Sequence, residues 1–342
     1  MSDLFDRCIN VYIYDTSGKE LARVITPKYG PKPEIKVEGC IISNTYQISG
    51  KVTITNLERS VNVADTKYLK VEMYYRGSGI LESMRKSIWY DVQFADQSKQ
   101  PPNRQVCFNC LAAGVTPDIL SHRITINEQD ANNEPLKDTL ENVLRRVIMG
   151  YNESLTKTVS ELMRSNFMLN SEPVFRMDTA LAAKARTSEV ALQWNYTPIS
   201  AILDDLTMST IDSEPVGTDA STKEEFPLYC YYIEDQNLVI SLNPNTLGYA
   251  LTSPDKISLD YVQSAYRFGP IINIKSLFDP RIHQDITVEI SSTNVDGKKI
   301  AGSLIPLLSS IGSDKVQFRP VGGINFVFST TGDNYMTFQG CV

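Results

Sequence analysis

The stretch YRFGPIINIKSLFDPRIHQDITVEISS, residues 266–292, is the part of the sequence that best defines the fold class. Apolar residues alternate with other residues in both of its halves: Ile272, Ile274 and Phe278, then Ile286, Val288 and Ile290. A period of two is the mark of a strand that buries one face. The link over residues 279–285 contains Pro280, which cannot donate a ladder hydrogen bond and suits a turn. The stretch therefore predicts two antiparallel strands joined as a long β-hairpin.

The first 112 residues repeat this alternation between clusters of turn-forming residues. The apolar stripes are Ile9, Val11, Ile13; Ile35, Val37, Ile41; Val52, Ile54; Leu69, Val71, Met73, Tyr75; Ile88, Tyr90, Val92, Phe94; and Val106, Phe108, Cys110. Several short strands with turn signals between them predict a β-sandwich or barrel.

The middle of the chain changes to helical spacing. Residues 132–149 and 153–168 each carry apolar side chains three and four positions apart. The clearest helix is expected over residues 197–208, where Thr197 can cap and Pro198 suits the first helical position. Its apolar stripe is Ile199, Ile202, Leu203 and Leu206, with Asp204 and Asp205 on the outward side.

These patterns predict a mainly β chain with an α+β middle. We expect a first β domain over residues 1–112 and a second over residues 255–342. Between them, residues 113–254 form a mixed, helix-containing region with a polar loop over 209–225 and a β-hairpin over 228–242. The amino-acid sequence shows no tandem repeat, although a structural duplication of the β domain would not require one.

Composition narrows the function classes. The chain has 342 residues, 42% hydrophobic and 21% charged, with 33 basic and 40 acidic side chains and a net charge of −7. A mildly acidic chain without a basic run is poorly suited to bind nucleic acid through its phosphates. It contains no apolar stretch of about 18 residues, so no membrane span or membrane binding of its own is expected. The acidic start does not have the pattern of a signal peptide, which predicts synthesis in the cytoplasm.

Six cysteines are present, and Cys107 and Cys110 form a C-x-x-C pattern. A structural zinc site would require a second pair at matching spacing, which the sequence does not contain. The segment around these cysteines reads as a strand, in which residues three apart point to opposite faces. We expect buried structural thiols, with zinc or redox chemistry as the alternative, and neither a metal, a cofactor nor a disulfide.

The sequence offers little for catalysis. A nucleophilic triad needs a histidine beside a serine or cysteine, and His122 and His283 lie in no nucleophile motif. Pairs of carboxylates such as Asp204 and Asp205 are expected on solvated faces rather than in a glycosidase site. We therefore predict no catalytic residues, although a hydrolase with acids hidden in the middle region remains an alternative.

Several stretches resemble the baseplate hub proteins of contractile-tailed bacteriophages. The strand ending SLFDPRI and the following ITVEIS are similar to the Leu-x-(Asn/Asp)-Pro hairpin of that family. Residues 50–60, GKVTITNLERS, resemble a strand and turn of its first tube-like domain, and KYLKVEMYYRG and SIWYDVQF fit the next strands. Residues 195–206, NYTPISAILDDL, fit the helix that follows this domain in the family.

The resemblance implies a structural, non-enzymatic virion component with two tail-tube-like β-barrel or sandwich domains. In this family a homotrimer forms a pseudo-sixfold ring that joins the hexameric tail tube to the trimeric central spike in the baseplate, beside other baseplate proteins. Genomic DNA would pass through the ring without specific binding.

Two features point to interfaces. The link in residues 279–285 offers an apolar tip of Phe278, Pro280 and Ile282, which we predict to contact a neighbouring chain; alternatively, the tip packs on its own domain. Tyrosines are frequent, and strand alternation places a set of them on outer faces: Tyr12, Tyr14, Tyr74, Tyr229 and Tyr231. Such side chains suit an interface, a cover provided by the same chain, or the ligand platform of a carbohydrate- or receptor-binding module.

Overall fold

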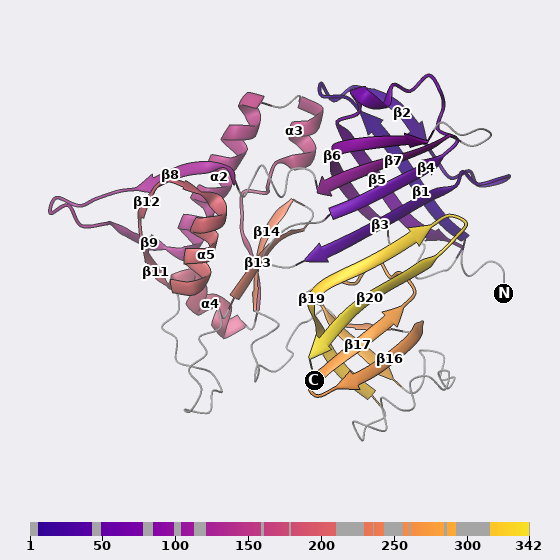
Figure 1. Cartoon of the computed structure of the whole chain (residues 1–342). Coiled ribbons are helices and arrows are strands. Elements are labelled where there is room, and N and C mark those ends of the chain that lie inside the picture. The colour runs from indigo at the N-terminus through magenta and orange to yellow at the C-terminus, as the bar shows by residue number, and fades with distance from the viewer. Residues whose placement is uncertain are drawn as a thin grey trace. The chain divides into compact units, whose positions relative to one another are not determined.

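The computed structural model describes residues 6–42, 49–77, 85–98, 104–112, 121–158, 161–177, 179–209, 229–234, 236–242, 256–259, 261–283, 286–291 and 315–341. By its internal contacts the chain divides into two compact units (Figure 1). The first unit contains residues 1–42, 47–113 and 257–342, and the second contains residues 43–46 and 114–256. The predicted three-domain boundaries stay a prediction, and the predicted polar loop lies outside the described residues apart from Ser209.

In the first unit, the described residues form one sheet of thirteen strands (Figure 1). The strands are β1 (Asp6–Tyr14), β2 (Glu20–Val24), β3 (Ile35–Ile42), β4 (Ser49–Thr55), β5 (Tyr68–Arg76), β6 (Lys86–Ser98), β7 (Gln105–Ala112), β15 (Lys256–Ser258), β16 (Val262–Phe268), β17 (Ile271–Ser276), β18 (Thr287–Ser291), β19 (Lys315–Ser329) and β20 (Asn334–Cys341). The main path runs β16-β17-β20-β19-β3-β4-β7-β6-β5-β1-β2, and β18 with β15 branches from β19. The pairings along this path are antiparallel, which confirms the prediction of a mainly β, antiparallel fold.

The same strand order occurs twice in this unit. We call β3-β4-β7-β6-β5 the first series and β16-β17-β20-β19-β18 the second series. The chain visits the five positions in the same sequence in both series, and the fourth strand of each is long. That strand carries a register shift near its middle, between Val92 and Phe94 in β6 and between Val321 and Asn325 in β19. The duplication is therefore one of topology.

The two long strands, β6 and β19, pair alike in their first halves and differ in their second halves. The first half of each pairs with the fifth strand of its own series, β6 with β5 and β19 with β18. The second half of β19 then pairs with β3, in register from Gly323 opposite Ile42 to Ser329 opposite Lys36. This pairing joins the second series to the first within one chain.

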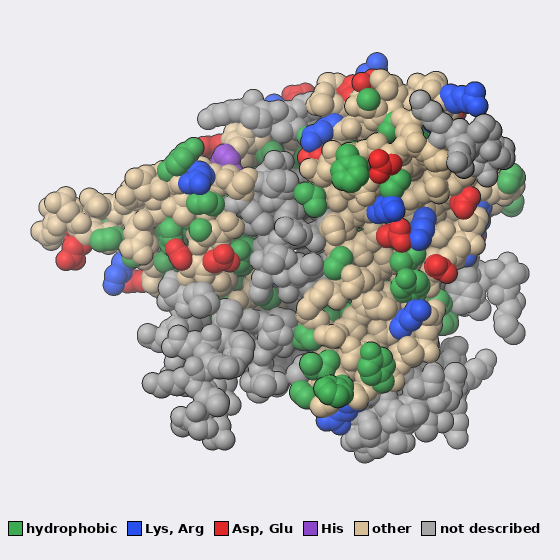
Figure 2. Space-filling view, in the orientation of Figure 1, with side chains coloured by type: hydrophobic (Ala, Val, Ile, Leu, Met, Phe, Trp, Pro, Cys, Tyr) green, Lys and Arg blue, Asp and Glu red, His purple; other side chains and the backbone are tan. Residues whose placement is uncertain are grey.

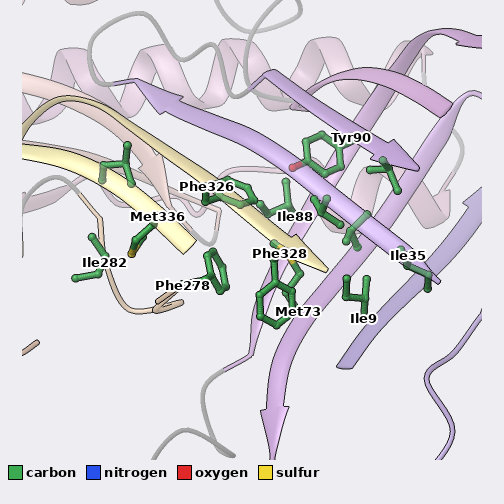
Figure 3. Close-up of a cluster of buried hydrophobic side chains, with 14 of the residues drawn as sticks. Ile9, Ile35, Met73, Ile88, Tyr90, Phe278, Ile282, Phe326, Phe328 and Met336 are labelled. Carbon is green, nitrogen blue, oxygen red and sulfur yellow. The ribbon is translucent and has the colours of Figure 1, made fainter. Parts of the chain in front are cut away.

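The predicted apolar stripes line one core that both series share. Figure 3 shows side chains of the early strands, such as Ile35 and Met73, in one cluster with Phe278 and Phe328 from the late part of the chain. The prediction for Phe94 is wrong, because this side chain is 59% exposed. The register shift after Val92 adds a residue to the strand and reverses which side chains face the core. Ile41 lies in β3, and its side chain lies outside the described part of the structure.

Residues 266–292 form the two predicted strands, but the predicted hairpin between them is wrong. β17 pairs with β16 and β20, whereas β18 pairs with β19 and β15. A tight turn at Gly269, whose φ of 61° suits glycine, returns the chain from β16 into β17 and occupies that edge. After β17, the Ile282 amide donates to the Asp279 carbonyl at 3.1 Å, so the predicted turn at Pro280 carries the chain away from β17.

The second unit contains the described helices longer than one turn and three small sheets. The helices are α2 (Leu140–Thr158), α3 (Glu161–Phe167), α4 (Thr179–Thr187) and α5 (Ile199–Ser209). The sheets are β8 (Arg123–Asn127) with β12 (Gln193–Pro198), β9 (Lys137–Thr139) with β11 (Glu189–Ala191), and β10 (Val174–Arg176) with β14 (Asn237–Leu242) and β13 (Tyr229–Glu234). The antiparallel pairing of β13 with β14 confirms the hairpin predicted over residues 228–242. In the described part of the chain no helix is long and apolar enough to span a membrane.

The helix predictions are confirmed in existence and corrected in extent. The helix expected from residue 132 starts only at Leu140, because the Asp130 carboxylate accepts the amides of Asn132 and Glu134 at 2.7 and 2.9 Å and holds a turn. α2 then continues through Gly150, so the expected break before residue 153 is absent from it. α5 begins one residue after Pro198, and its predicted stripe is buried as expected: Ile199, Ile202, Leu203 and Leu206.

Candidate assembly surface

One face of the sheet in the first unit is polar from β16 across to β6. Cross-strand partners share a face, so the pairings can be followed from strand to strand. Tyr266 pairs with Asn273, Asn273 with Gln339, and further partners continue the row across β19, β3, β4, β7 and β6. We define the polar face as Ser264, Tyr266, Phe268, Asn273, Lys275, Tyr335, Thr337, Gln339, Asn325, Val327, Lys36, Glu38, Lys51, Cys107, Asn109, Phe94, Asp96 and Ser98. The opposite face of these strands carries the core.

The polar face is hollowed where the second series lies. A groove of about 520 Å³ is lined by Ser264, Tyr266, Asn273, Lys275, Asn325, Thr337 and Gln339 together with Ile274, Gly323 and Phe338. The Gln339 amide donates to the Asn273 side-chain oxygen at 2.9 Å, and the Lys275 ammonium lies 4.4 Å from the centre of the Tyr335 ring. The groove therefore combines amides, hydroxyls and one cation with a similar share of apolar surface.

Charges of both signs alternate over this face. Lys36 and Glu38 form an ion pair of 2.7 Å, and the hydrogen bond to Glu38 raises the pKa of Lys36. Lys51, Lys275 and Asp96 complete the charged members of the defined set. Figure 2 shows positive and negative side chains interspersed over these strands, with hydrophobic side chains gathered near β16 and β17. The net charge of −7 is therefore not concentrated on the polar face.

A second surface, on the outer side of β1, β5 and β6, combines rings with charges. The rings of Tyr14 and Trp89 lie 5.3 Å apart, and the Lys70 ammonium lies 5.9 Å from the Trp89 ring. The carboxylate of Glu72, a residue that is only 7% exposed, forms ion pairs with the Lys70 ammonium at 3.3 Å and the Arg85 guanidinium at 3.1 Å. These rings and charges contact one another within this chain, so the surface needs no second molecule to satisfy them.

The predicted tyrosine surface is only partly present. Tyr12 and Tyr74 are half-buried, while Tyr14, Tyr229 and Tyr231 are buried by their own chain. Near the open edges of the large sheet the exposed aromatic side chains are instead Phe94, Tyr266 and Phe268, at 59%, 62% and 80%. The sequence analysis did not identify them, although continuing the alternation back to residue 266 would have placed Tyr266 and Phe268 opposite the core face.

The predicted apolar tip lies in the core of the first unit. Phe278 and Ile282 are 4% and 1% exposed, and Pro280 is buried. Figure 3 shows Phe278 near Phe328, and their ring centres are 4.9 Å apart. This burial agrees with the alternative that the tip packs on its own domain, and an interface role for these three residues stays a prediction.

The cysteines of the C-x-x-C pattern lie in β7 and do not converge. Cys110 is buried beside the core stripe, whereas Cys107 is half-buried on the polar face. Both thiols are free, and burial raises the pKa of Cys110 well above its usual range. Among the described residues, no three histidine, cysteine or acidic side chains are close enough together to hold a metal ion.

The residues considered for catalysis have structural partners. His122 Nδ1 lies 3.2 Å from Ser154 Oγ, and the His122 carbonyl accepts the amide of Ile199 at the start of α5. Asp204 and Asp205 are exposed as predicted, but each carboxylate also accepts a hydrogen bond, from the Tyr231 hydroxyl at 2.7 Å and from the Trp194 indole at 2.9 Å. These contacts hold α5 against β13 and β12.

No protein-family model matches this chain, and no curated protein matches it by sequence. Solved structures do match. A tail protein from Neisseria meningitidis MC58 has 9% identity and a TM-score of 0.50, with 99% of this chain and 97% of that chain covered.

The chain has the fold of this tail protein. Two further solved structures match with TM-scores below 0.5. The 43 kDa tail protein of prophage MuSo2 from Shewanella oneidensis has 9% identity and a TM-score of 0.49, over 98% of this chain and 96% of that chain. The E. coli c3393 protein, a component of the type VI secretion system, has 10% identity and a TM-score of 0.45, over 91% of this chain and 74% of that chain. The resemblance to tail proteins expected from the sequence is thus confirmed for the fold.

Proposed function

We propose that this chain is a structural component of a phage-type tail, the baseplate hub. Its support is the fold, which matches that of a tail protein over nearly the full length of both chains. In this role the chain is not an enzyme, needs no cofactor, and is made in the host cytoplasm before it joins the virion baseplate.

The topological duplication explains how such a hub could match two symmetries. Three copies of a chain with two equivalent strand series present six equivalent units in a ring. Such a homotrimer fits a hexameric tail tube on one side and a trimeric central spike on the other, beside the remaining baseplate proteins.

The polar face supplies a surface suited to line the channel. Its amides, hydroxyls and alternating charges contain no basic stripe that would hold phosphates as DNA passes. The face carries three lysines and two acids, so it does not itself repel phosphates. Any repulsion of the DNA would come from other parts of the ring.

The test is assembly with the natural partners. The chain is expressed with the tube protein and the spike protein of the same tail gene cluster, and the mass of the complex is measured by light scattering and its shape by electron microscopy. We expect three copies of the chain in a ring bound to both partners. A chain that stays monomeric with both partners present, or that degrades purified peptidoglycan by itself, would overturn the proposal.

A further inference from the structure

Several strand edges in the first unit, the outer edge of β2 among them, lack a neighbour within the described part of the chain, and two of them have counterparts that pair within the chain. One is the outer edge of β16, the terminal strand of the main path. The other belongs to the second half of β6, residues 93–98, which we call the β6 tail. The pairing of β6 with β5 ends at Asp91, and the last backbone contact on that side is the Val92 amide with the Lys67 carbonyl at 2.8 Å. Open edges of this kind favour pairing with another strand.

The chain contains its own template for covering them. The second half of β19 occupies the same position in the second series as the β6 tail occupies in the first. On the side away from β20, this half of β19 pairs with β3, the first strand of the other series. The strand equivalent to β3 in the second series is β16. By this correspondence, the partner of a β6 tail is a β16 strand.

Within one chain this pairing is not available, because six strands of the same sheet separate β16 from β6 on the main path. A second copy can supply it. We propose that the β6 tail of one copy pairs antiparallel with β16 of a second copy, so that the sheets of neighbouring copies become continuous. The inference rests on the proposed function, since it names the contact that closes the ring of hub subunits.

The exposed aromatics support the pairing independently of the topology. Phe94 pairs with Asn109, and Tyr266 pairs with Asn273, so both rings stand on the polar face. Phe268 stands on the same face, two residues from Tyr266. Phe94, Tyr266 and Phe268 are 59%, 62% and 80% exposed in one chain. Antiparallel pairing would place them as cross-strand neighbours and remove their apolar surface from water.

The contact is head to tail, because the two edges differ. Such heterologous contacts close into rings when the rotation between copies allows it. The polar face would then continue across the boundary between copies, from Phe94, Asp96 and Ser98 to Ser264, Tyr266 and Phe268.

Cysteine cross-linking between copies tests this pairing. One population of the chain carries a cysteine in the β6 tail and a second carries one in β16, and both have Cys107→Ser because Cys107 lies opposite Asp96. The mixture is assembled with the tube and spike proteins and oxidised, and the linked peptides are identified by mass spectrometry. The template sets the register: Asn325 stands opposite Cys40 in the β19–β3 pairing, and Phe94 and Tyr266 hold the corresponding places. We expect Phe94→Cys to link to Tyr266→Cys, while Ser98→Cys, four residues further along β6, does not link to Tyr266→Cys. The matched control is Arg23→Cys on β2, the other terminal strand of the path.

The outcomes separate the two proposals. A complex with three copies in which β16 links to β2, or links to no described strand, would overturn the pairing and leave the hub function standing. Failure to assemble at all would overturn both. As a second measurement, Phe94→Asp should stay folded by circular dichroism and lose the trimer, whereas Tyr29→Asp, at an 82% exposed site, should keep it. A Phe94→Asp chain that still forms the trimer would also overturn the pairing.

Discussion

The hydroxyl of Tyr75 donates a hydrogen bond of 2.7 Å to the carbonyl oxygen of Phe278 and accepts one of 2.8 Å from the Asn334 side chain. Tyr75 belongs to β5 in the first series, whereas Asn334 belongs to β20 in the second series and Phe278 to the link that follows β17. The ring of Tyr75 is 1% exposed and meets Phe328 edge to face at 5.4 Å. Burial raises the pKa of this phenol far above its usual value, so the neutral hydroxyl persists. A polar contact inside the core thus joins the two series.

Replacing Tyr75 with Phe should lower the free energy of unfolding by about 1–3 kcal/mol, since the buried Phe278 carbonyl and the half-buried Asn334 amide lose their partner. Urea denaturation of the purified chain measures this change. Tyr29→Phe is the control, because that ring is 82% exposed. Equal stability of Tyr75→Phe and the unmodified chain would show that the contact adds nothing to the junction.

The double variant Phe278→Asp, Ile282→Asp distinguishes the two roles considered for the apolar tip. Both side chains are almost fully buried, so two unpaired carboxylates in the core should prevent folding. Circular dichroism and size-exclusion chromatography check the outcome. A variant that stays folded but no longer assembles with the tube and spike proteins would instead support the predicted interface.

Sequence reasoning located the strands well and their partners poorly. Alternation depends only on which face is buried, so stripes such as Ile9, Val11 and Ile13 were predictable from local sequence. Pairing depends on distant segments, and β19 pairs with β3 from the opposite end of the chain. Adjacency in sequence therefore suggested a false hairpin between β17 and β18. The register shift that exposes Phe94 has no local signature, and this side chain was placed in the core stripe for that reason.

In the second unit, replacing Leu203 with Ala should lower the free energy of unfolding by about 2–5 kcal/mol. Leu203 is 2% exposed on the buried stripe of α5, so truncation leaves a cavity. Urea denaturation followed by the fluorescence of Trp194, which packs near α5 through Asp205, reports on this unit. Leu203→Met, which nearly preserves volume, should cost less than 1.5 kcal/mol. Similar values for the two variants would contradict the burial of this helix face.

Stability should fall as the pH rises above about 8.5, the usual pKa of a thiol in an unfolded chain. Burial raises the pKa of Cys110 in the folded state, so the unfolded state loses its proton first. The contribution of this thiol is fully present below the unfolded pKa and is lost as pH rises toward the folded pKa, by about 1.4 kcal/mol for each pH unit. Denaturation under reducing conditions between pH 7.5 and 10 measures the slope.

Cys110→Ala should make that slope shallower, and Cys107→Ala serves as the matched control in the same strand. Alanine carries no titrating group, so the role of the Cys110 thiol is read from the change of stability with pH. A loss of stability that is already present at pH 7.5 reflects the lost side chain and not its titration. An unchanged slope in Cys110→Ala would show that this thiol does not govern the alkaline loss of stability.

The junction between the two series depends on a glycine. Gly39 in β3 stands opposite Phe326 in β19, and a Cβ at this position would lie 2.4 Å from the Phe326 ring. The ring has little room to move, since Phe326 is 2% exposed and its centre lies 5.3 Å from that of Phe278. Gly39→Ala should therefore lower the free energy of unfolding by about 1–3 kcal/mol through overpacking.

A double-mutant cycle with Phe326→Leu tests whether the ring is the cause. The smaller side chain clears the space above residue 39, so Gly39→Ala should cost less in the Phe326→Leu background than in the unmodified chain, with a coupling of about 0.5–3 kcal/mol. Urea denaturation of the four chains gives the cycle. Strictly additive costs would mean that the destabilisation comes from the backbone of β3 rather than from the contact with Phe326. In that case the glycine would no longer account for the close approach of β3 and β19.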